Sequence, residues 1–348
     1  SLQNISEYRK NKICVSKLKY ISTENMLQNF AGIIPYTSEE DISGVEFCVG
    51  DTLLANIRPY LRKAWLATHD GACSTDVLAL CPLDITPAFL NNIIEQDRFI
   101  DYVMSGVKGS KMPRGDKAHI LAYETAIPSL LEQEKINSFM QLLHQRIAKI
   151  QMEIELLKKY KRGAVTHILS GKSTAFAVTS SWTEHTLSEL CSEFRSGRNI
   201  SATLIHQNGN YPVYGGNGIR GYCNQYSHDG EYVVVGRQGA LCGNVRLIQG
   251  KNYLSEHAIA VQANEANETK FLLYLLDYMK LGQYSDQGAQ PGLAVNKLLR
   301  LKCMVPDKQT QIKIASFLMS FDFQISTQER MLMLQNNQRR ALLQQLFI

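Results

Sequence analysis

Two long stretches of the chain have apolar residues at every third or fourth position, which predicts two long helices. The first runs from Glu132 to Leu169 without a proline, and its apolar residues follow a heptad repeat. The a positions are Ile136, Leu143, Ile150, Leu157 and Ala164, and the d positions are Met140, Ile147, Ile154 and Ile168. A narrow apolar seam sustained over about five heptads is typical of a coiled coil.

The second stretch, residues 306–348, follows the same repeat less regularly. Its apolar residues are Ile314, Phe321 and Leu342 at a and Leu318, Ile325, Leu332 and Leu346 at d. Gln328 and Gln335 occupy a positions, where polar residues usually fix register and partner orientation at some cost in stability. We expect the two helices to pair with each other. The alternative is that helices of another protein join one or both seams.

The chain also repeats itself with an offset of about 178 residues, which indicates an internal duplication. The clearest matches are Pro128 with Pro306, Gln133 with Gln311, Lys135 with Lys313, Phe139 with Phe317, and Ile147 with Ile325. Upstream the likeness is looser: residues 74–80 resemble residues 255–261, and residues 109–113 resemble residues 288–291. The sequence therefore predicts two similar units in tandem, each a globular part followed by a long helix.

Each globular part has the pattern of mixed α and β structure. Residues 76–80 and 232–235 have strand composition and are flanked by turn-forming residues. Thr86 before Pro87 predicts the start of a helix that runs to about Met104, with a counterpart in the second unit over residues 269–281. We therefore expect the α+β class, with two tandem mixed α/β domains that are each followed by a long helix.

Composition places the chain among ordinary globular proteins. Of its 348 residues, 45% are hydrophobic and 20% are charged, which excludes a disordered or low-complexity chain. This length is sufficient for two domains with separate cores. The 37 Lys and Arg exceed the 32 Asp and Glu by five charges, an excess that permits a polyanionic partner without requiring one.

The cysteines and the apolar segments give an expectation about location. The eight cysteines form no CxxC pair and no ladder with histidines, so we expect reduced thiols and no structural zinc. No apolar stretch reaches the roughly 18 residues of a membrane-spanning helix. The first residues show no secretory signal. These features favour a cytoplasmic protein without a metal or other cofactor.

Two glycine-containing motifs imitate nucleotide-binding loops, but their contexts argue against that function. Residues 216–221 fit GxGxxG, yet the residues after them have no helical period, so no helix N-terminus would meet a pyrophosphate. Residues 170–174 imitate the end of a P-loop, but they follow a long helix and Thr166 stands where the motif requires glycine. We interpret Gly171 as the end of the helix and residues 173–181 as a linker.

Catalytic signatures are missing from the sequence, whereas binding chemistry is abundant. No serine, cysteine or metal-dependent hydrolase motif is present, and we interpret His119 and His257 as structural histidines. In both globular parts, Arg, Asn, Gln and Lys cluster near glycines. Arg, Asn and Gln can recognise base edges in the major groove of DNA, and Lys or Arg can neutralise phosphates. The alternative interpretation is that these segments are surface turns whose charges only improve hydration.

We select the following candidate DNA-binding residues: Asn56, Arg58, Lys63, Lys111 and Arg114 in the first unit, and Tyr214, Asn217, Arg220, Arg237, Gln238 and Gln290 in the second.

The tandem plan resembles the specificity subunit (HsdS) of type I restriction-modification enzymes. The segments that carry this resemblance are residues 50–60, 127–136, 211–222, 235–240 and 305–314, and the likeness extends over nearly the whole chain. One departure is Thr310, which stands where the first copy has Glu132. Recognition domains of this family vary greatly, so the resemblance transfers no base-contacting positions, and the candidate residues above rest on their chemistry.

The resemblance implies a division of the chain into four parts. Residues 1–127 and 173–305 would be target recognition domains, and residues 128–172 and 306–348 would contain the two spacer helices. In this family the helices form an antiparallel coiled coil, and the domains are related by a pseudo-twofold axis. Two related domains on a rigid rod would recognise a bipartite, asymmetric DNA site whose gap is set by the length of the rod.

The resemblance also implies a non-catalytic subunit and its partners. These are double-stranded DNA, two methyltransferase subunits that methylate adenine, and translocating nuclease subunits that cleave DNA; no membrane is involved. Two alternatives remain from the residues alone. One is a coiled-coil scaffold that binds proteins without DNA specificity, and the other is an enzyme whose active site is too dispersed to recognise in a single sequence.

Overall fold

The computed structural model describes residues 1–109, 111–171, 181–239, 241–286 and 292–346. Its contacts divide the chain into two units, Ser1–Met152 with Glu329–Ile348, and Glu153–Gln328. We call them unit 1 and unit 2. Each unit contains a globular part and a portion of two long helices, α4 (Leu130–Leu169) and α9 (Lys308–Leu346). Within the described residues, no helix has both the length and the hydropathy needed to cross a membrane.

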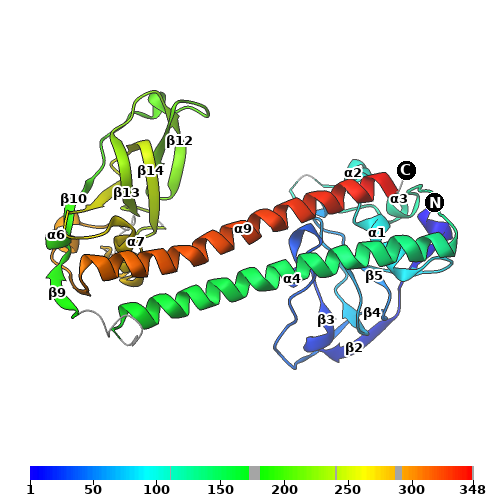
Figure 1. The fold of residues 1–348 in the computed structure, drawn as a ribbon. Helices are drawn as coiled ribbons and strands as arrows, with labels where there is room; N and C mark the ends of the chain where they lie inside the picture. Colours follow the sequence, from blue (N-terminus) through cyan, green and yellow to red (C-terminus); the bar gives the residue numbers. More distant parts are fainter. Residues whose placement is uncertain (110, 172–180, 240, 287–291, 347–348) are drawn as a thin grey trace. The chain divides into compact units, whose positions relative to one another are not determined.

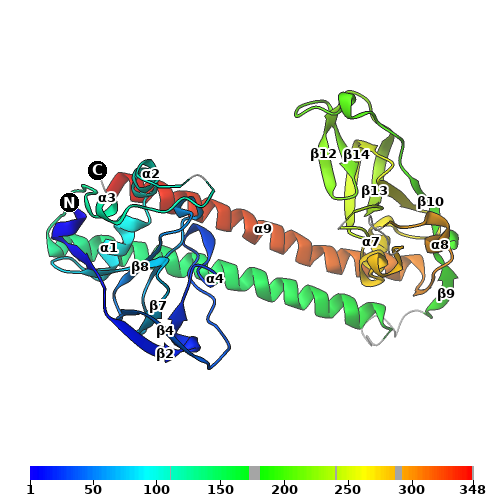
Figure 2. The same ribbon diagram turned by 180° about the vertical axis from the view of Figure 1, so that it is seen from behind.

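The globular part of unit 1 contains two four-stranded sheets (Figure 2), with the strand orders β1-β8-β5-β6 and β2-β4-β7-β3. The strands are β1 (Ser6–Tyr8), β2 (Lys12–Ser16), β3 (Tyr20–Ile21), β4 (Asp41–Phe47), β5 (Thr52–Ala55), β6 (Ala64–Leu66), β7 (Gly71–Cys73) and β8 (Val77–Pro82). Helix α1 (Pro87–Ile94) packs against β5, β6 and β8, and its apolar residues share one core with the start of α4 and the end of α9. Helices α2 (Asp97–Ser105) and α3 (Lys117–Leu121) follow.

The globular part of unit 2 is built on one six-stranded sheet (Figure 1), with the order β10-β15-β13-β14-β11-β12. Its strands are β10 (Cys191–Ser196), β11 (Tyr211–Gly215), β12 (Gly218–Cys223), β13 (His228–Gly236), β14 (Val245–Leu254) and β15 (Ala258–Ala263). Helix α7 (Thr269–Tyr278) packs against β13, β14 and β15. The short elements β9 (Thr183–Thr186) and β16 (Lys302–Val305) pair with each other, and α6 (Leu187–Leu190) and α8 (Val295–Leu299) complete the unit. The mixed α/β class predicted from the sequence is confirmed.

One predicted helix of unit 1 is in fact two helices. The prediction ran from Thr86 to about Met104, but α1 ends at Ile94 and α2 begins at Asp97. The break places Glu95 against the long helices, where it joins a buried ion pair described below. In unit 2, α7 ends at Tyr278 rather than near Leu281, because Lys280 takes a left-handed conformation with φ +48°. The predicted linker at residues 173–181 lies almost wholly outside the described residues.

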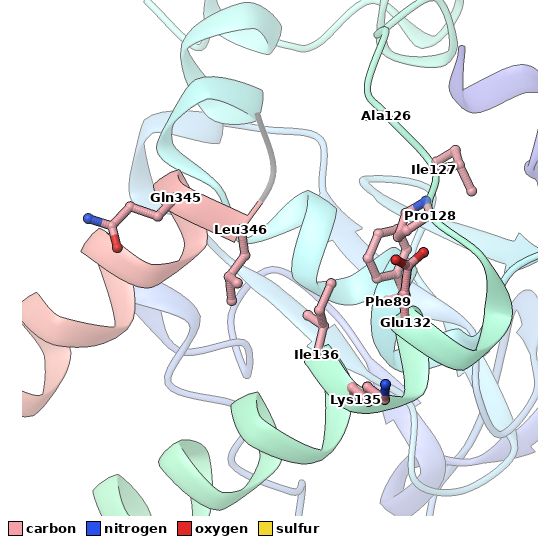
Figure 3. Close-up of a pocket in the computed structure, with 9 residues that line it drawn as sticks. All are labelled: Phe89, Ala126, Ile127, Pro128, Glu132, Lys135, Ile136, Gln345 and Leu346. Atoms are coloured by element: carbon pink, nitrogen blue, oxygen red, sulfur yellow. The ribbon is translucent and has the colours of Figure 1, made fainter.

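The long helices are antiparallel in each unit. In unit 1, Ile136 at the start of α4 and Leu346 at the end of α9 face the same 490 Å³ pocket, which is also lined by Phe89 of α1 (Figure 3). In unit 2, Gln328 Nε2 of α9 donates to Glu153 Oε1 at 3.1 Å, and Lys161 Nζ donates to Asp322 Oδ1 at 2.5 Å. As the residue number rises on α4, the partner's number falls on α9. The predicted pairing of the two helices is confirmed.

The heptad assignment also agrees with burial along this seam, with one exception. Met140 and Ile154 on α4 and Ile314 and Leu318 on α9 are all at most 4% exposed. Leu346, assigned to a d position, is 39% exposed because it lies at the end of the helix, beside the pocket.

A buried glutamine in each unit explains why the same segment is repeated before the two long helices. Gln133 Oε1 accepts from the backbone N–H of Thr86, just before α1, and its Nε2 donates to the carbonyl of Pro128. In unit 2, Gln311 Oε1 accepts from the N–H of Glu268, just before α7, and its Nε2 donates to the carbonyl of Pro306. Both side chains are 1% exposed. Each therefore satisfies backbone groups at the start of two helices at once.

The departure at Thr310 is a change of capping chemistry. In unit 1, Ser129 and Glu132 form a capping box, in which Glu132 Oε2 accepts from the Ser129 N–H and hydroxyl and Ser129 Oγ accepts from the Glu132 N–H. In unit 2, Asp307 takes the position of the cap and accepts from both the N–H and the hydroxyl of Thr310. Both arrangements satisfy the first turn of a long helix, so the substitution preserves its function.

A basic residue that the heptad analysis did not assign joins α9 to the globular part of unit 1. Arg339 falls at a d position, yet it is 6% exposed, and its Nη1 donates to Glu95 Oε2 at 3.2 Å. His144 Nε2 of α4 lies 3.2 Å from the same nitrogen and 3.3 Å from Glu95 Oε2. Burial alone would raise the pKa of Glu95, but its hydrogen bond with His144 and the charge of Arg339 hold that pKa below its ordinary value.

Unit 2 has a related arrangement at the corresponding place in the repeat. Lys161 of α4 donates to Asp322 of α9 and lies 5.3 Å from the centre of the Tyr274 ring. The Tyr274 hydroxyl of α7 donates to Asp322 Oδ2 at 2.6 Å. Burial and the Asp322 carboxylate both raise the pKa of Tyr274. In each unit, then, one basic side chain from a long helix connects the other long helix to the globular part, at the end of α1 in unit 1 and at α7 in unit 2.

We predict that Gln311→Leu lowers the free energy of unfolding by about 1–3 kcal/mol, because it leaves the partly buried Glu268 N–H and the buried Pro306 carbonyl without their partner. Gln133→Leu should cost a similar amount through the equivalent groups of unit 1. Gln338→Leu, on the exposed side of α9, is the control and should change the unfolding free energy little. Chemical denaturation of the three variants measures these differences.

We predict that Arg339→Met costs about 3–5 kcal/mol of stability, because Glu95 would stay buried without its counter-charge. The double variant Arg339→Met with Glu95→Gln should recover part of this loss, and Arg340→Met on the exposed face is the control.

The same ion pair makes stability depend on pH. Because the pKa of Glu95 is lowered in the folded state, its contribution is complete above the ordinary pKa of a glutamate and is lost as pH falls through the lowered value. A comparison of wild type and Glu95→Gln across that range measures it; parallel curves would contradict the assignment.

Candidate nucleic-acid interface

Three chain segments of unit 2 meet where strand β13 ends and strand β15 begins. They are the loop after β13, the turn between β14 and β15, and residues 292–293 before α8. The Arg237 N–H of the first donates to the His257 carbonyl of the second at 2.9 Å. The Leu293 N–H of the third donates to the Arg237 carbonyl at 2.9 Å, and Gln238 forms a β-bridge with Gly292. Backbone hydrogen bonds therefore hold the predicted residues Arg237 and Gln238 at a junction of three segments.

Unit 1 contains the same junction with the same hydrogen bonds. The Asn56 N–H, after β5, donates to the Asp76 carbonyl at 2.8 Å in the turn before β8. The Gly115 N–H donates to the Asn56 carbonyl at 3.0 Å, and Ile57 forms a β-bridge with Arg114.

The hydrogen bonds show which positions of the two units are equivalent: Asn56 and Arg237, Ile57 and Gln238, Asp76 and His257, and Arg114 and Gly292. The backbone framework is duplicated, while the side chains at equivalent positions differ.

In unit 2, a hairpin turn adds a fourth segment to the junction. Strands β11 and β12 pair from Tyr211 to Cys223 around Gly216 and Asn217. A Cβ at Gly216 would lie 2.4 Å from the Gln238 carbonyl oxygen, so glycine is required for this close approach. The turn leaves Asn217 exposed beside the loop after β13. Residues 216–221 therefore form a hairpin, as their strand-like continuation predicts, and not a nucleotide-binding turn.

Side-chain hydrogen bonds fix both predicted residues of the loop after β13. Arg237 Nε donates to the Leu293 carbonyl at 3.4 Å, and its Nη1 donates to the Glu256 carbonyl at 3.3 Å. Gln238 Oε1 lies 2.5 Å from His257 Nδ1, and His257 Nε2 lies 3.1 Å from Glu256 Oε1. The sequence interpretation of His257 as a hydrogen-bonding structural residue thus missed its place within the candidate site. The sequence feature that could have revealed this place is the match of residues 74–80 with residues 255–261, which contain His257.

The remaining candidates of unit 2 lie on the hairpin. Tyr214 on β11 is half-buried against the face that contains Val234 and Ala260. Arg220 on β12 is exposed, and its side chain lies over Gly215, where a Cβ would be 2.5 Å from Arg220 Cδ. Gln290 lies outside the described residues.

The candidates of unit 1 differ in their surroundings. Arg58, with φ +51°, and Lys111 are exposed, and Arg114 pairs with Asp76 at 3.0 Å. Asn56 is 8% exposed and packs beside Gly115, where a Cβ would lie 2.8 Å from its Oδ1. Lys63 Nζ donates to the Thr23 carbonyl at 2.6 Å, on a different segment. The structure therefore gathers Asn56, Arg58 and Arg114 at the junction, whereas Lys63 is turned towards another loop.

One further ion pair anchors this segment of unit 1. Lys108 Nζ donates to Asp116 Oδ2 at 2.5 Å, and Asp116 also caps α3 by accepting from the N–H groups of Ala118 and His119. The Lys108 hydrogen bond and these amides lower the pKa of Asp116 to about 2. Throughout the described ranges, no three His, Cys, Asp or Glu side chains come together in a way that could hold a metal ion.

Comparison with known proteins agrees with this arrangement. Residues 179–332 match the family model described as type I restriction modification DNA specificity domain. The specificity subunit of the type I restriction enzyme EcoprrI from Escherichia coli is 46% identical over 141 residues, which are 39% of this chain and 35% of that subunit. The crystal structure of a type I restriction-modification S subunit from M. genitalium superposes with a TM-score of 0.71 at 16% identity, covering 100% of this chain and 95% of the other. The resemblance to type I specificity subunits is confirmed.

The matches to specificity subunits differ in what they cover. The aligned segment spans about a third of the EcoprrI subunit, and the family model covers the junction of unit 2, including Arg237, Gln238 and His257. The structural likeness extends over the whole chain and shows the fold: two mixed α/β domains, each followed by a long helix. A second solved structure, from work on assembly and conformational transition of a type I R-M system, has a TM-score of 0.57 at 16% identity over 99% of this chain and 95% of the other.

Proposed function

We propose that this chain is the sequence-specific DNA-binding subunit of a type I restriction-modification complex and recognises a bipartite target. The observation that carries the proposal is the duplicated junction, in which one backbone framework holds Asn56 and Ile57 in unit 1 but Arg237 and Gln238 in unit 2. Side chains with different hydrogen-bonding groups in equivalent places suit two different half-sites of one target. A protein scaffold without DNA specificity would have no such use for them.

The division of labour follows the resemblance to specificity subunits. Residues 1–127 and 173–305 act as target recognition domains, and residues 128–172 and 306–348 contain the helices that connect them. The chain itself is non-catalytic and binds double-stranded DNA in a cytoplasmic complex. Methyltransferase subunits then methylate adenine, and nuclease subunits cleave unmodified DNA.

A duplicated pair of apolar side chains supports two copies of one partner. Phe139 on α4 and Leu334 on α9 are 48% and 48% exposed in unit 1, and Phe317 and Leu156, their counterparts in the repeat, are 42% and 45% exposed in unit 2. The same two positions of the repeat are thus apolar and exposed in both units. We infer that one methyltransferase subunit contacts the helices of each unit.

We predict that Gln238→Ala and Arg237→Ala weaken binding to the cognate DNA more than binding to random duplex. The expected loss for a bidentate base contact is about 1–3 kcal/mol. Titration of both duplexes with the chain assembled with its methyltransferase subunits measures the difference. Gln249→Ala, an exposed glutamine on β14, is the control. Equal losses on cognate and random duplex would indicate phosphate contacts or a structural role instead.

We predict that Phe139→Glu and Phe317→Glu each remove one of the two methyltransferase subunits, because a carboxylate at the contact cannot be buried without a large cost. The double variant should bind neither. Native mass spectrometry of the purified complexes counts the bound subunits, and Leu142→Glu, at another exposed apolar position of α4, is the comparison. Full occupancy in the double variant would show that the partners bind elsewhere.

A further inference from the structure

The turn before the last strand of each sheet contributes a side chain to the junction. In unit 2 the Ala258 N–H donates to the Ser255 carbonyl, and in unit 1 the Val77 N–H donates to the Ser74 carbonyl, both at 3.0 Å. These bonds form the same tight turn, and His257 and Asp76 occupy the same place within it. Each of them contacts a side chain that projects from the junction.

In unit 2, His257 lies between two acceptor groups. The Glu256 carboxylate, 3.1 Å from Nε2, only accepts hydrogen bonds, and so does the amide oxygen of Gln238, 2.5 Å from Nδ1. In the structure, the amide oxygen of Gln238 faces Nδ1 of His257, and its nitrogen, with two N–H donors, points away from the ring.

In unit 1, the polarity of the same position is reversed. Asp76 Oδ1 accepts from Arg114 Nη2 at 3.0 Å, so the turn residue of unit 1 is a hydrogen-bond acceptor and its partner is a donor. The side chains of Asp76 and Arg114 are 33% and 57% exposed, which places the pair at the surface of the junction. The change from Asp76 to His257 thus accompanies the change in the side chain that is held, a guanidinium in unit 1 and an amide oxygen in unit 2.

We propose that Asp76 and His257 are positioning residues for base recognition, which determine the hydrogen-bonding atoms that Arg114 and Gln238 present to DNA. This inference rests on the proposed function. In unit 2, Gln238 presents its amide nitrogen and recognises an acceptor in the major groove, N7 of a purine or O6 of guanine. Asp76 and His257 themselves need not touch a base.

Two nearly isosteric variants separate this role from a structural one. His257→Asn places an amide nitrogen, a donor, close to the position of Nδ1, whereas His257→Asp places a carboxylate oxygen there. With aspartate, the Gln238 amide turns to donate its N–H, so its oxygen faces the DNA and favours the donors N6 of adenine or N4 of cytosine. The two variants have almost the same size and differ in hydrogen-bonding polarity.

The experiment measures methylation rates of the assembled complex on a set of duplexes in which each base pair of both half-sites is varied in turn. We expect His257→Asn to keep the wild-type preference. His257→Asp should lower the rate on the preferred base about tenfold at one position of one half-site and raise the relative rate on a base that offers a donor. Asp76→Asn is the internal control and should alter preference in the other half-site alone.

A variant of the held residue provides an independent test if His257→Asp does not fold. Gln238→Glu keeps His257 and its bond to one carboxylate oxygen, but replaces the outward N–H group by an acceptor, so it should shift the preference at the same position as His257→Asp. Thermal unfolding of each variant checks its fold.

Two results would overturn the inference, and they differ in what else they overturn. If the wild-type complex discriminates between sequences but His257→Asp and Gln238→Glu lower all rates uniformly, the positioning role is wrong and the proposed function stands. If the wild-type complex methylates all duplexes equally, the proposed function itself fails.

Discussion

Both units depend on the satisfaction of buried backbone groups where a long helix begins. A helix start leaves N–H groups without partners, and here the first turns of each long helix, with one buried glutamine, lie beside the start of α1 or α7. Gln133 and Gln311 solve this with one amide that accepts from one helix entrance and donates to the other. This contact orients the long helix relative to its own globular part. The apolar seam residues of the long helix are then buried against the other long helix.

The second level of organisation is a charged contact whose chemistry differs between the copies. Unit 1 uses Arg339 with Glu95 and His144, and unit 2 uses Lys161 with Asp322 and Tyr274. Arg339 and Glu95 in unit 1 are almost completely buried, which makes this ion pair costly unless both charges are paired. Divergence has therefore kept the position of this contact and exchanged its groups. At the junctions, Asp76 and His257 are equivalent, but the side chains that they contact, Arg114 and Gln238, come from different positions of the framework.

Such a design separates stability from recognition. The backbone hydrogen bonds of each junction do not involve the side chains that vary, so Asn56 can become Arg237 without loss of the framework. Glycines permit the close contacts on which the framework depends, as Gly216 does beneath the Gln238 carbonyl. A domain built in this way can change its hydrogen-bonding groups at low structural cost, which suits the DNA recognition proposed above.

The sequence by itself determined the features that arise from local or periodic patterns: the two helices, their shared seam, the duplication, the mixed α/β class and most of the loops with binding chemistry. Only the tertiary structure decided which side chains meet. Arg339 lies at a d position and is buried beside Glu95. Glu95 is distant in the sequence and lies at the break in a predicted helix. His257 contacts Gln238 because the turn before β15 lies beside the loop after β13. Lys63 instead donates to the Thr23 carbonyl, outside the junction. Periodicity records which face of an element is buried, whereas a contact between distant residues depends on the path of the whole chain.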